Sequence, residues 1–271
     1  MNIKEVKILF MGTAEFGIPT LKVLKDNFNL DTIITNYDKP SGRGLKIEFS
    51  PVKKFAINNN IKYLQPKNLK EQSLIDKITS INPDIIVVVA FRMIPKSIWQ
   101  IPKYGTINLH ASLLPNYRGS APINWVIINN ENFTGVTTFF IDDKIDTGDI
   151  LLQEKIKVDK KINAGELHDK LKVIGARTVK KTIDKILNNS LKQKKQEHDG
   201  NYKTAYKLDK ENNTVNRVSA LTRDSERASR TLARLCRCPP PPNQQAKGRT
   251  KAARQGLSSH SLSHLSLVGC L

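Results

Sequence analysis

The chain has 271 residues, 39% of them hydrophobic, and a formal net charge of +19 at pH 7. This length is enough for one large domain or two modest ones. No apolar stretch approaches the length of a membrane span, and the apolar run at residues 6–11 is too short for a secretory signal. We therefore predict a cytoplasmic protein without a membrane segment.

The positive charge is unevenly distributed. From Arg217 onward the sequence contains eight Arg and two Lys, whereas the part before it contains four Arg and thirty Lys. Such an excess of charge favours a polyanionic partner such as RNA, although solvated lysines account for much of it. The three cysteines, Cys236, Cys238 and Cys270, form a poor metal-binding set, and we expect neither a bound metal nor a disulfide framework.

The N-terminal segment predicts the start of a Rossmann-like unit. A buried strand at residues 6–11 is followed by a turn from Gly12 to Gly17 and an amphipathic helix at residues 18–25. The two glycines are spaced G-x-x-x-x-G without a following Lys-Ser/Thr, so neither the P-loop nor the dinucleotide fingerprint is present. We therefore expect no nucleotide cofactor.

A second strand is predicted at residues 30–35, and a polar, basic loop follows it at residues 36–46. A long ordered loop inside a domain is more often functional than decorative, although a plain surface connection is the alternative. The next predicted elements are a helix at 52–58, a short strand at 61–64, a helix at 69–80 and a strand at 84–90.

The run at residues 84–90 is almost continuously β-branched, as in a central parallel strand that is covered on both faces. Ligands of open α/β sheets bind outside the carboxyl ends of such strands. This places Phe91, Arg92 and Met93 at the rim of a pocket. The alternative for Phe91 and Met93 is simple core packing.

The segment at residues 107–119 reads Ile-Asn-Leu-His-Ala-Ser-Leu-Leu-Pro-Asn-Tyr-Arg-Gly. Alternate residues of a strand face the same side, so Asn108 and His110 are predicted to project into one pocket. An amide donor and a base that titrates near neutrality suit attack on a carbonyl. The alternative is a buried Asn and His that satisfy each other at the end of a strand.

A helix is predicted at residues 121–129, a strand pair at 134–141 and 150–158, and a long helix at 163–187. Between the two strands, the sequence Ile-Asp-Thr-Gly-Asp places the carboxylate of Asp146 in a tight turn. An acyl transfer to an amine needs side chains that donate and accept protons. The side chains of Asn108, His110 and Asp146 together supply these groups.

The order Asn-x-His, Ser-Leu-Leu-Pro-x-x-Arg-Gly and Asp-Thr-Gly-Asp resembles the folate-dependent formyltransferases over roughly the first 210 residues. The resemblance implies a Rossmann-like, mostly parallel sheet with helices on both faces. It also implies that an amine attacks the formyl carbon directly. Asn108 would stabilise the oxyanion. His110 would also donate to the oxyanion or protonate the leaving nitrogen. Asp146 would stabilise the charged imidazole and accept the amine proton.

The same resemblance implies the ligands. The formyl donor would be 10-formyltetrahydrofolate, and the acceptor would be the amino group of initiator methionyl-tRNA. The folate pocket would be lined by Ser112, Leu113, Leu114, Pro115, Phe91 and Met93. The residues Gly42, Arg43, Gly44 and Lys46 resemble a loop that enters the tRNA acceptor stem. Alternatives are a formyltransferase for another amine, such as a sugar nucleotide, and a non-catalytic RNA-binding protein.

We predict three parts: a catalytic domain at residues 1–188, a linker at 189–212 and a basic, low-complexity tail at 213–271. The tail contains no Phe, Trp or Tyr and includes the run Cys-Pro-Pro-Pro-Pro, so we expect it to be disordered. It stands where the family has a C-terminal β-barrel. The change from lysine to arginine suggests the hypothesis of a fused or frameshifted reading frame. We expect the protein to be a monomer.

Overall fold

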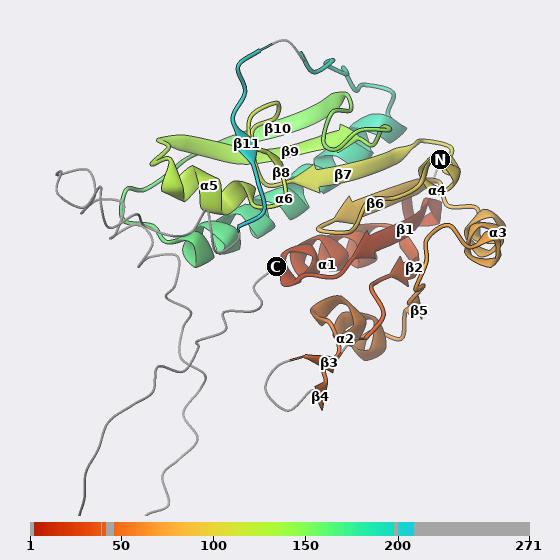
Figure 1. The fold of residues 1–271 in the computed structure, drawn as a ribbon. Helices are drawn as coiled ribbons and strands as arrows, with labels where there is room; N and C mark the ends of the chain where they lie inside the picture. The colour runs from red at the N-terminus through yellow and green to blue at the C-terminus, as the bar shows by residue number, and fades with distance from the viewer. Residues whose placement is uncertain (1–2, 39, 42–45, 198–199, 209–271) are drawn as a thin grey trace, which may run out of the picture. The chain divides into compact units, whose positions relative to one another are not determined.

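The computed structural model describes residues 3–38, 40–41, 46–197 and 200–208 (Figure 1). All of them lie in the first of two units of the chain, Met1–Arg237. The predicted tRNA-binding residues Gly42, Arg43 and Gly44 lie outside the described residues, and so does the predicted tail at 213–271. None of the described helices is both long and apolar enough to cross a membrane.

The centre of the fold is a seven-stranded sheet with the order β10-β9-β7-β6-β1-β2-β5. The strands β5, β2, β1, β6 and β7 are parallel, whereas β9 and β10 form an antiparallel pair at one edge. This confirms the predicted, mostly parallel sheet. The strands are β1 (Lys7–Gly12), β2 (Asn29–Ile34), β5 (Lys62–Leu64), β6 (Ile85–Val89), β7 (Thr106–His110), β9 (Phe133–Phe140) and β10 (Ile150–Lys157).

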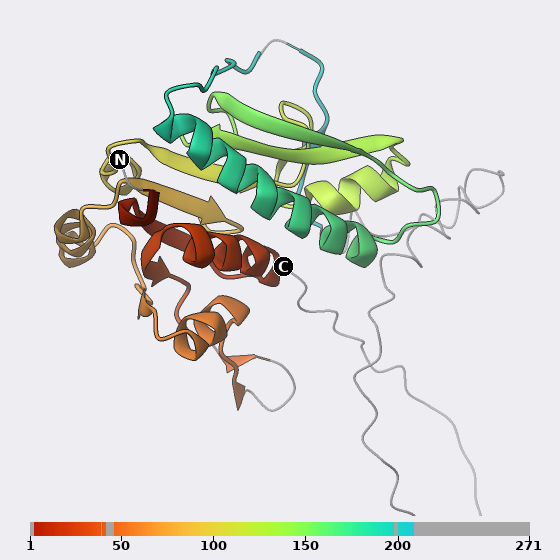
Figure 2. The ribbon, with the colours of Figure 1, turned by 180° about the vertical axis from the view of Figure 1, so that it is seen from behind.

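Helices cover both faces of the sheet. On one face, α1 (Ile18–Asn27), α2 (Pro51–Asn58), α5 (Pro122–Ile128) and α6 (Ala164–Leu187) contribute to the larger hydrophobic core. On the other face, α3 (Gln72–Ile81) and α4 (Lys96–Trp99) pack against a second core. Figure 2 shows the long helix α6 lying across the sheet beside α1. Every residue of β6 is buried, as expected for a parallel strand that is covered on both sides.

Local sequence signals explain where the longest helix begins. The side chain of Asn163 accepts a hydrogen bond from the backbone N–H of Glu166 at 2.9 Å, and the Glu166 carboxylate accepts one from the N–H of Asn163 at 3.0 Å. This reciprocal capping box satisfies two N–H groups that the helix leaves open. Farther along α6, Gly175 lies so close to the sheet that an added Cβ would be 2.7 Å from a methyl group of Leu109.

Some elements differ from the prediction. The helix predicted to start at residue 69 begins at Gln72, because the side chain of Asn68 accepts a hydrogen bond from the N–H of Lys70 and forms a turn there. The two-residue strands β3 (Pro40–Ser41) and β4 (Lys46–Ile47) pair within the predicted loop. Neither these strands nor α4, β8 (Arg118–Gly119) and β11 (Thr204–Ala205) were predicted, since such short elements carry no periodicity. Short 3-10 turns lie at Ile3–Glu5 and Glu15–Gly17.

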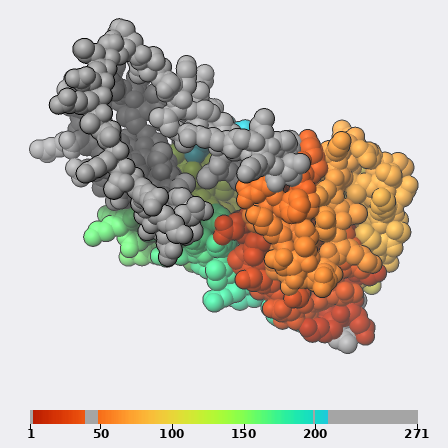
Figure 3. Space-filling view, turned by 90° about the horizontal axis from the view of Figure 1, so that it is seen from below, coloured from red at the N-terminus to blue at the C-terminus, as the bar shows by residue number. Residues whose placement is uncertain are grey.

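The order in which strands are added to the sheet reverses at β1. The strand after β1 in the sequence, β2, lies on one side of it, whereas β6 and β7 lie on the other side. Seen from below, the red to gold N-terminal residues therefore occupy one side of the molecule and the green residues the other (Figure 3). The carboxyl ends of β1, β6 and β7 meet at one edge, which is where open α/β sheets bind their ligands.

Candidate active site

Strand β7 places the predicted amide and imidazole on one face of the sheet. In its antiparallel pairing with β9, Asn108 lies opposite Phe139 and His110 lies opposite Thr137. The intervening Leu109 faces the larger core. The imidazole of His110 is buried with 7% of its surface exposed, whereas Asn108 is half-buried. The side-chain amide of Asn108 makes no hydrogen bond with the residues that the structure describes.

The imidazole lies between two oxygen acceptors. Its Nδ1 is 3.7 Å from Oδ2 of Asp146, and its Nε2 donates a hydrogen bond to the backbone carbonyl of Tyr117 at 2.7 Å. The same carboxylate oxygen of Asp146 accepts a hydrogen bond from the N–H of Gly119 at 2.9 Å. Because both ring nitrogens face acceptors, the site can accommodate a doubly protonated, cationic imidazole. The structure thus brings together Asp146 and His110, which lie far apart in the sequence.

The turn that carries Asp146 has an unusual backbone. Asp146 has a φ of 54°, which is in the left-handed region that Asp tolerates better than most residues. Two residues later, an added Cβ on Gly148 would lie 1.7 Å from the carbonyl oxygen of Phe140, so only glycine fits there. The hydroxyl of Thr147 donates to both carboxylate oxygens of Asp142, at 2.8 and 2.9 Å. Close packing and local hydrogen bonds therefore fix the position of the Asp146 carboxylate.

The loop after β7 contains the predicted folate-binding residues 112–115. The hydroxyl of Thr137 donates to the carbonyl of Ser112 at 2.6 Å and accepts from the N–H of Leu114 at 3.1 Å. Gln153 of β10 donates to the carbonyl of Leu114 at 2.9 Å. Ser112 and Leu114 are buried, and the peptide bond between Leu114 and Pro115 is cis. The side chains of Thr137, which is buried, and Gln153, which is exposed, therefore fix the loop, while Leu113 and Pro115 stay half-buried.

The segment after β6 is at the same edge of the sheet. Phe91 is partly buried and packs against the second core, whereas Met93 is 68% exposed, so core packing does not explain Met93. The guanidinium of Arg92 donates to the carbonyls of Pro66 and Lys67, at 2.5 and 2.9 Å. These two hydrogen bonds hold Arg92 against the β5–α3 connection.

A buried ion pair holds the base of the predicted tRNA-binding loop. The ammonium of Lys53, which is 6% exposed, forms an ion pair with Asp38 and lies 3.8 Å from the centre of the Phe49 ring. Burial alone would raise the pKa of the Asp38 carboxyl, but hydrogen bonds from Lys53 and Gln65 outweigh it and hold that pKa below its usual value. Asp38 and Phe49 flank the β3–β4 hairpin. Of the predicted loop residues, only the backbone of Lys46 is described.

Sequence reasoning missed four residues that position this site: Tyr117, Thr137, Gln153 and Gln196. The backbone carbonyl of Tyr117 accepts the hydrogen bond that fixes His110. Tyr117 has a backbone φ of 62°, which no sequence pattern predicts. The other three act through hydrogen bonds to loops that are distant in the sequence. A sequence alone does not reveal such contacts.

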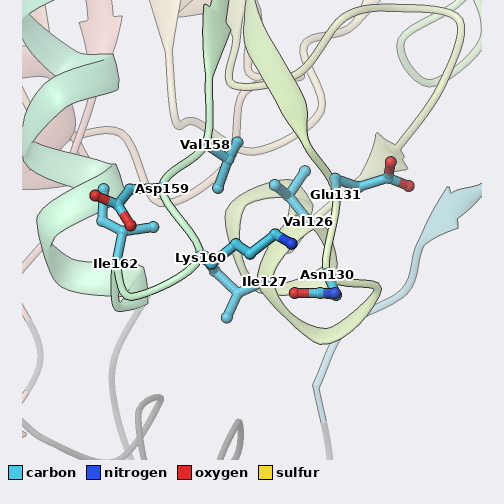
Figure 4. Close-up of a pocket in the computed structure, with 8 residues that line it drawn as sticks. All are labelled: Val126, Ile127, Asn130, Glu131, Val158, Asp159, Lys160 and Ile162. Atoms are coloured by element: carbon cyan, nitrogen blue, oxygen red, sulfur yellow. The ribbon is translucent and has the colours of Figure 1, made fainter.

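The small cavity in Figure 4 lies elsewhere. It has a volume of about 20 Å³, which is room for a single water molecule, and none of the predicted catalytic or folate-binding residues lines it. Among the described residues, no group of three or more His, Cys, Asp or Glu side chains is placed to hold a metal ion.

The Formyl transferase family matches residues 6–183, and the chain belongs to this family. Among its curated relatives, methionyl-tRNA formyltransferase of Flavobacterium johnsoniae is 51% identical over 211 residues, which are 78% of this chain and 67% of that protein. The enzyme of the same name from Flavobacterium psychrophilum is 48% identical over 222 residues, or 81% of this chain and 70% of that protein. The corresponding enzyme of Clostridioides difficile is 50% identical, and the chain covers 63% of its length.

Solved structures support the same family. The sugar 3N-formyl transferase WlaRD, determined in the presence of dTDP and 5-N-formyl-THF, is 30% identical with a TM-score of 0.58, covering 78% of this chain and 72% of that one. An N-formyltransferase from Helicobacter canadensis, in complex with folinic acid and dTDP-3-aminofucose, is 26% identical with a TM-score of 0.56. That match covers 78% of this chain and 73% of the other.

Proposed function

We propose that this protein transfers the formyl group of 10-formyltetrahydrofolate to the amino group of initiator methionyl-tRNA, a step that prepares the tRNA for translation initiation. The observation that carries the proposal is the arrangement of Asn108, His110 and Asp146 at the carboxyl edge of the sheet. The names of the curated relatives favour methionyl-tRNA over other amines as the acceptor. The two formyltransferase structures with bound folates support a folate as the donor.

Formyl transfer to an amine needs no nucleophile from the enzyme. The amine attacks the formyl carbon, the carbonyl oxygen gains negative charge, and the bond from carbon to the folate nitrogen then breaks. The side-chain amide of Asn108 has donors that no described residue occupies, and Asn108 is only half-buried in β7, so this amide is available to the developing oxyanion. A single oxyanion donor of this kind contributes about 3 kcal/mol of transition-state stabilisation.

The reaction also moves protons. The attacking amine loses a proton, and the leaving nitrogen gains one. The carboxylate of Asp146, with Oδ2 3.7 Å from Nδ1 of His110, accepts the amine proton, directly or through a water molecule. A cationic His110 keeps its Nε2–H on the Tyr117 carbonyl and donates the Nδ1–H, which is 3.7 Å from Asp146 and makes no hydrogen bond there, to the oxyanion or to the leaving nitrogen. The nearby Asp146 carboxylate stabilises that cation. The carbonyl of Tyr117 fixes the plane of the ring during these steps.

The remaining assignments concern the two substrates. Residues 112–115, together with Phe91 and Met93, surround the folate. The loop residues Gly42, Arg43, Gly44 and Lys46 contact the tRNA acceptor stem, and the Asp38–Lys53 ion pair joins the described residues at the base of this loop. We further propose that the protein acts as a monomer in the cytoplasm and needs no metal. Light scattering of the purified protein tests whether it is a monomer, and formyl transfer after EDTA treatment tests whether it needs a metal.

The decisive experiment measures transfer of labelled formyl from 10-formyltetrahydrofolate to methionyl-tRNA by the full chain, with a tRNA-free control. Asn108→Ala and Asp146→Ala should each lower kcat at least about a hundredfold while folate binding persists. Asn58→Ala is a suitable control, since Asn58 is an exposed residue of α2. Wild-type turnover in either site variant would refute the assignment.

A further inference from the structure

The segment that sequence analysis reads as a linker lies against the loops of the active site. Figure 1 shows β11 beside β8. Strand β8 directly follows the loop that comes after β7, the strand that carries Asn108 and His110. Gln196, which precedes β11, is the most deeply buried polar residue of this segment, with 5% of its surface exposed. Its neighbours Lys195 and Glu197 are exposed, so the chain turns this one side chain inward.

The amide of Gln196 connects the two loops that surround the catalytic carboxylate. Its nitrogen donates to the backbone carbonyl of Asp146 at 3.0 Å and to that of Gly148 at 2.7 Å. Its oxygen accepts from Nε and Nη2 of Arg118, at 3.1 and 2.6 Å. Every hydrogen bond runs in the direction that an amide allows, with the nitrogen facing carbonyls and the oxygen facing a guanidinium. The next residue of the chain after Arg118, Gly119, donates to the Asp146 side chain.

Backbone contacts fix the segment on either side of Gln196. Lys194 and Ile150 exchange two hydrogen bonds, at 2.8 and 2.9 Å, which pair the start of the segment with β10. Farther on, the carbonyl of Ala205 accepts from the N–H of Ser120 at 2.9 Å. A Cβ on Gly119 would lie 2.4 Å from that same carbonyl, so the two strands approach as closely as backbones can. The segment is therefore anchored at both ends.

From this network we infer that Gln196 is a positioning residue for formyl transfer: it holds the turn of Asp146 at the distance from His110 that the reaction needs. The inference rests on the proposed function only for its catalytic consequence. Asp146 has a left-handed backbone, and this conformation persists only where surrounding contacts enforce it. Within the described part of the chain, Gln196 is the side chain that hydrogen-bonds to the backbone carbonyls of this turn. The catalytic unit therefore extends beyond residue 188 and includes Gln196.

Two substitutions distinguish the positioning of Asp146 from the alternative, in which Gln196 only holds the Arg118 side chain. Gln196→Ala removes all four hydrogen bonds. Gln196→Glu keeps the volume and the acceptor for Arg118, but it places an oxygen against the two carbonyls of the turn. If Gln196 positions Asp146, both variants should lower kcat about tenfold to a hundredfold, because misplacement of a catalytic group by about 1 Å has an effect of that size. The KM for folate should change much less, since residues 112–115 keep their own hydrogen bonds.

Gln193→Ala is the matched control, because Gln193 is an exposed residue of the same type on the same segment. The second readout is hydrogen exchange, followed by mass spectrometry, in peptides that cover residues 142–150 and β6. Exchange in the 142–150 peptide should rise about tenfold in both Gln196 variants and stay unchanged in Gln193→Ala, with β6 protected throughout. Should Gln196→Ala also lose protection in β6, the comparison rests on Gln196→Glu.

Wild-type kcat or wild-type exchange in Gln196→Glu would overturn the inference, and so would an equal loss in Gln193→Ala. If the wild-type chain transferred no formyl group, the proposed function would fail instead. In that case the exchange of the 142–150 peptide would still decide whether Gln196 holds the turn.

Discussion

Thr137→Val is the substitution that most directly tests how the loop at residues 112–115 is held. Thr137 is fully buried, and its hydroxyl donates to the carbonyl of Ser112 and accepts from the N–H of Leu114. Valine has nearly the same shape, so the change leaves no cavity and removes only the hydroxyl. The buried carbonyl and the buried N–H then each lose a partner, at about 1–3 kcal/mol apiece. Gln153, which also donates to this hydroxyl, is exposed and can bind water instead.

We therefore expect Thr137→Val to lower the free energy of unfolding by about 2–6 kcal/mol, which corresponds to a fall in Tm of about 4–24 °C. Urea titrations followed by circular dichroism measure this change. Thr134→Val is the control: Thr134 lies on the same strand, is 2% exposed, and its hydroxyl has no hydrogen-bond partner among the described residues. If the two variants lost stability equally, the hydroxyl of Thr137 would not be what holds the loop.

Two further predictions concern the other loops of the site. Burial favours the neutral form of Asp38, but hydrogen bonds from Lys53 and Gln65 prevail and lower its pKa. The carboxylate therefore stabilises the fold above the unfolded pKa, and this contribution is lost as the pH falls through the folded pKa. Urea midpoints between about pH 6 and pH 3 should fall less steeply in Asp38→Asn than in the wild type, and equal slopes would contradict the pKa shift. Gly148→Ala should abolish formyl transfer or folding, because its Cβ would overlap the carbonyl of Phe140; full activity would show that the turn can move.

Much of the fold could be predicted from the sequence because it depends on residues that are close along the chain. The β-branched run at 84–90 predicts the buried strand β6, and the structure confirms it. The alternation of Asn108 and His110 with apolar residues predicts that the two polar side chains share a face, and the register of β7 with β9 places them so. The start of α6 follows from the capping residue Asn163. In each case the signal is a period or a cap within one element.

The tertiary structure alone decided how these elements surround the site. The direction of the Arg92 side chain depends on two carbonyls of the β5–α3 connection, which no local pattern identifies. The hydrogen bonds of Gln196 span 50 residues to Asp146 and 78 residues to Arg118. A glutamine in a lysine-rich stretch reads as solvent-exposed, and its role exists only once packing has closed those distances. Periodicity and capping act within a few residues, so the sequence determined the elements and the candidate catalytic residues, whereas contacts between distant segments determined what holds them in position.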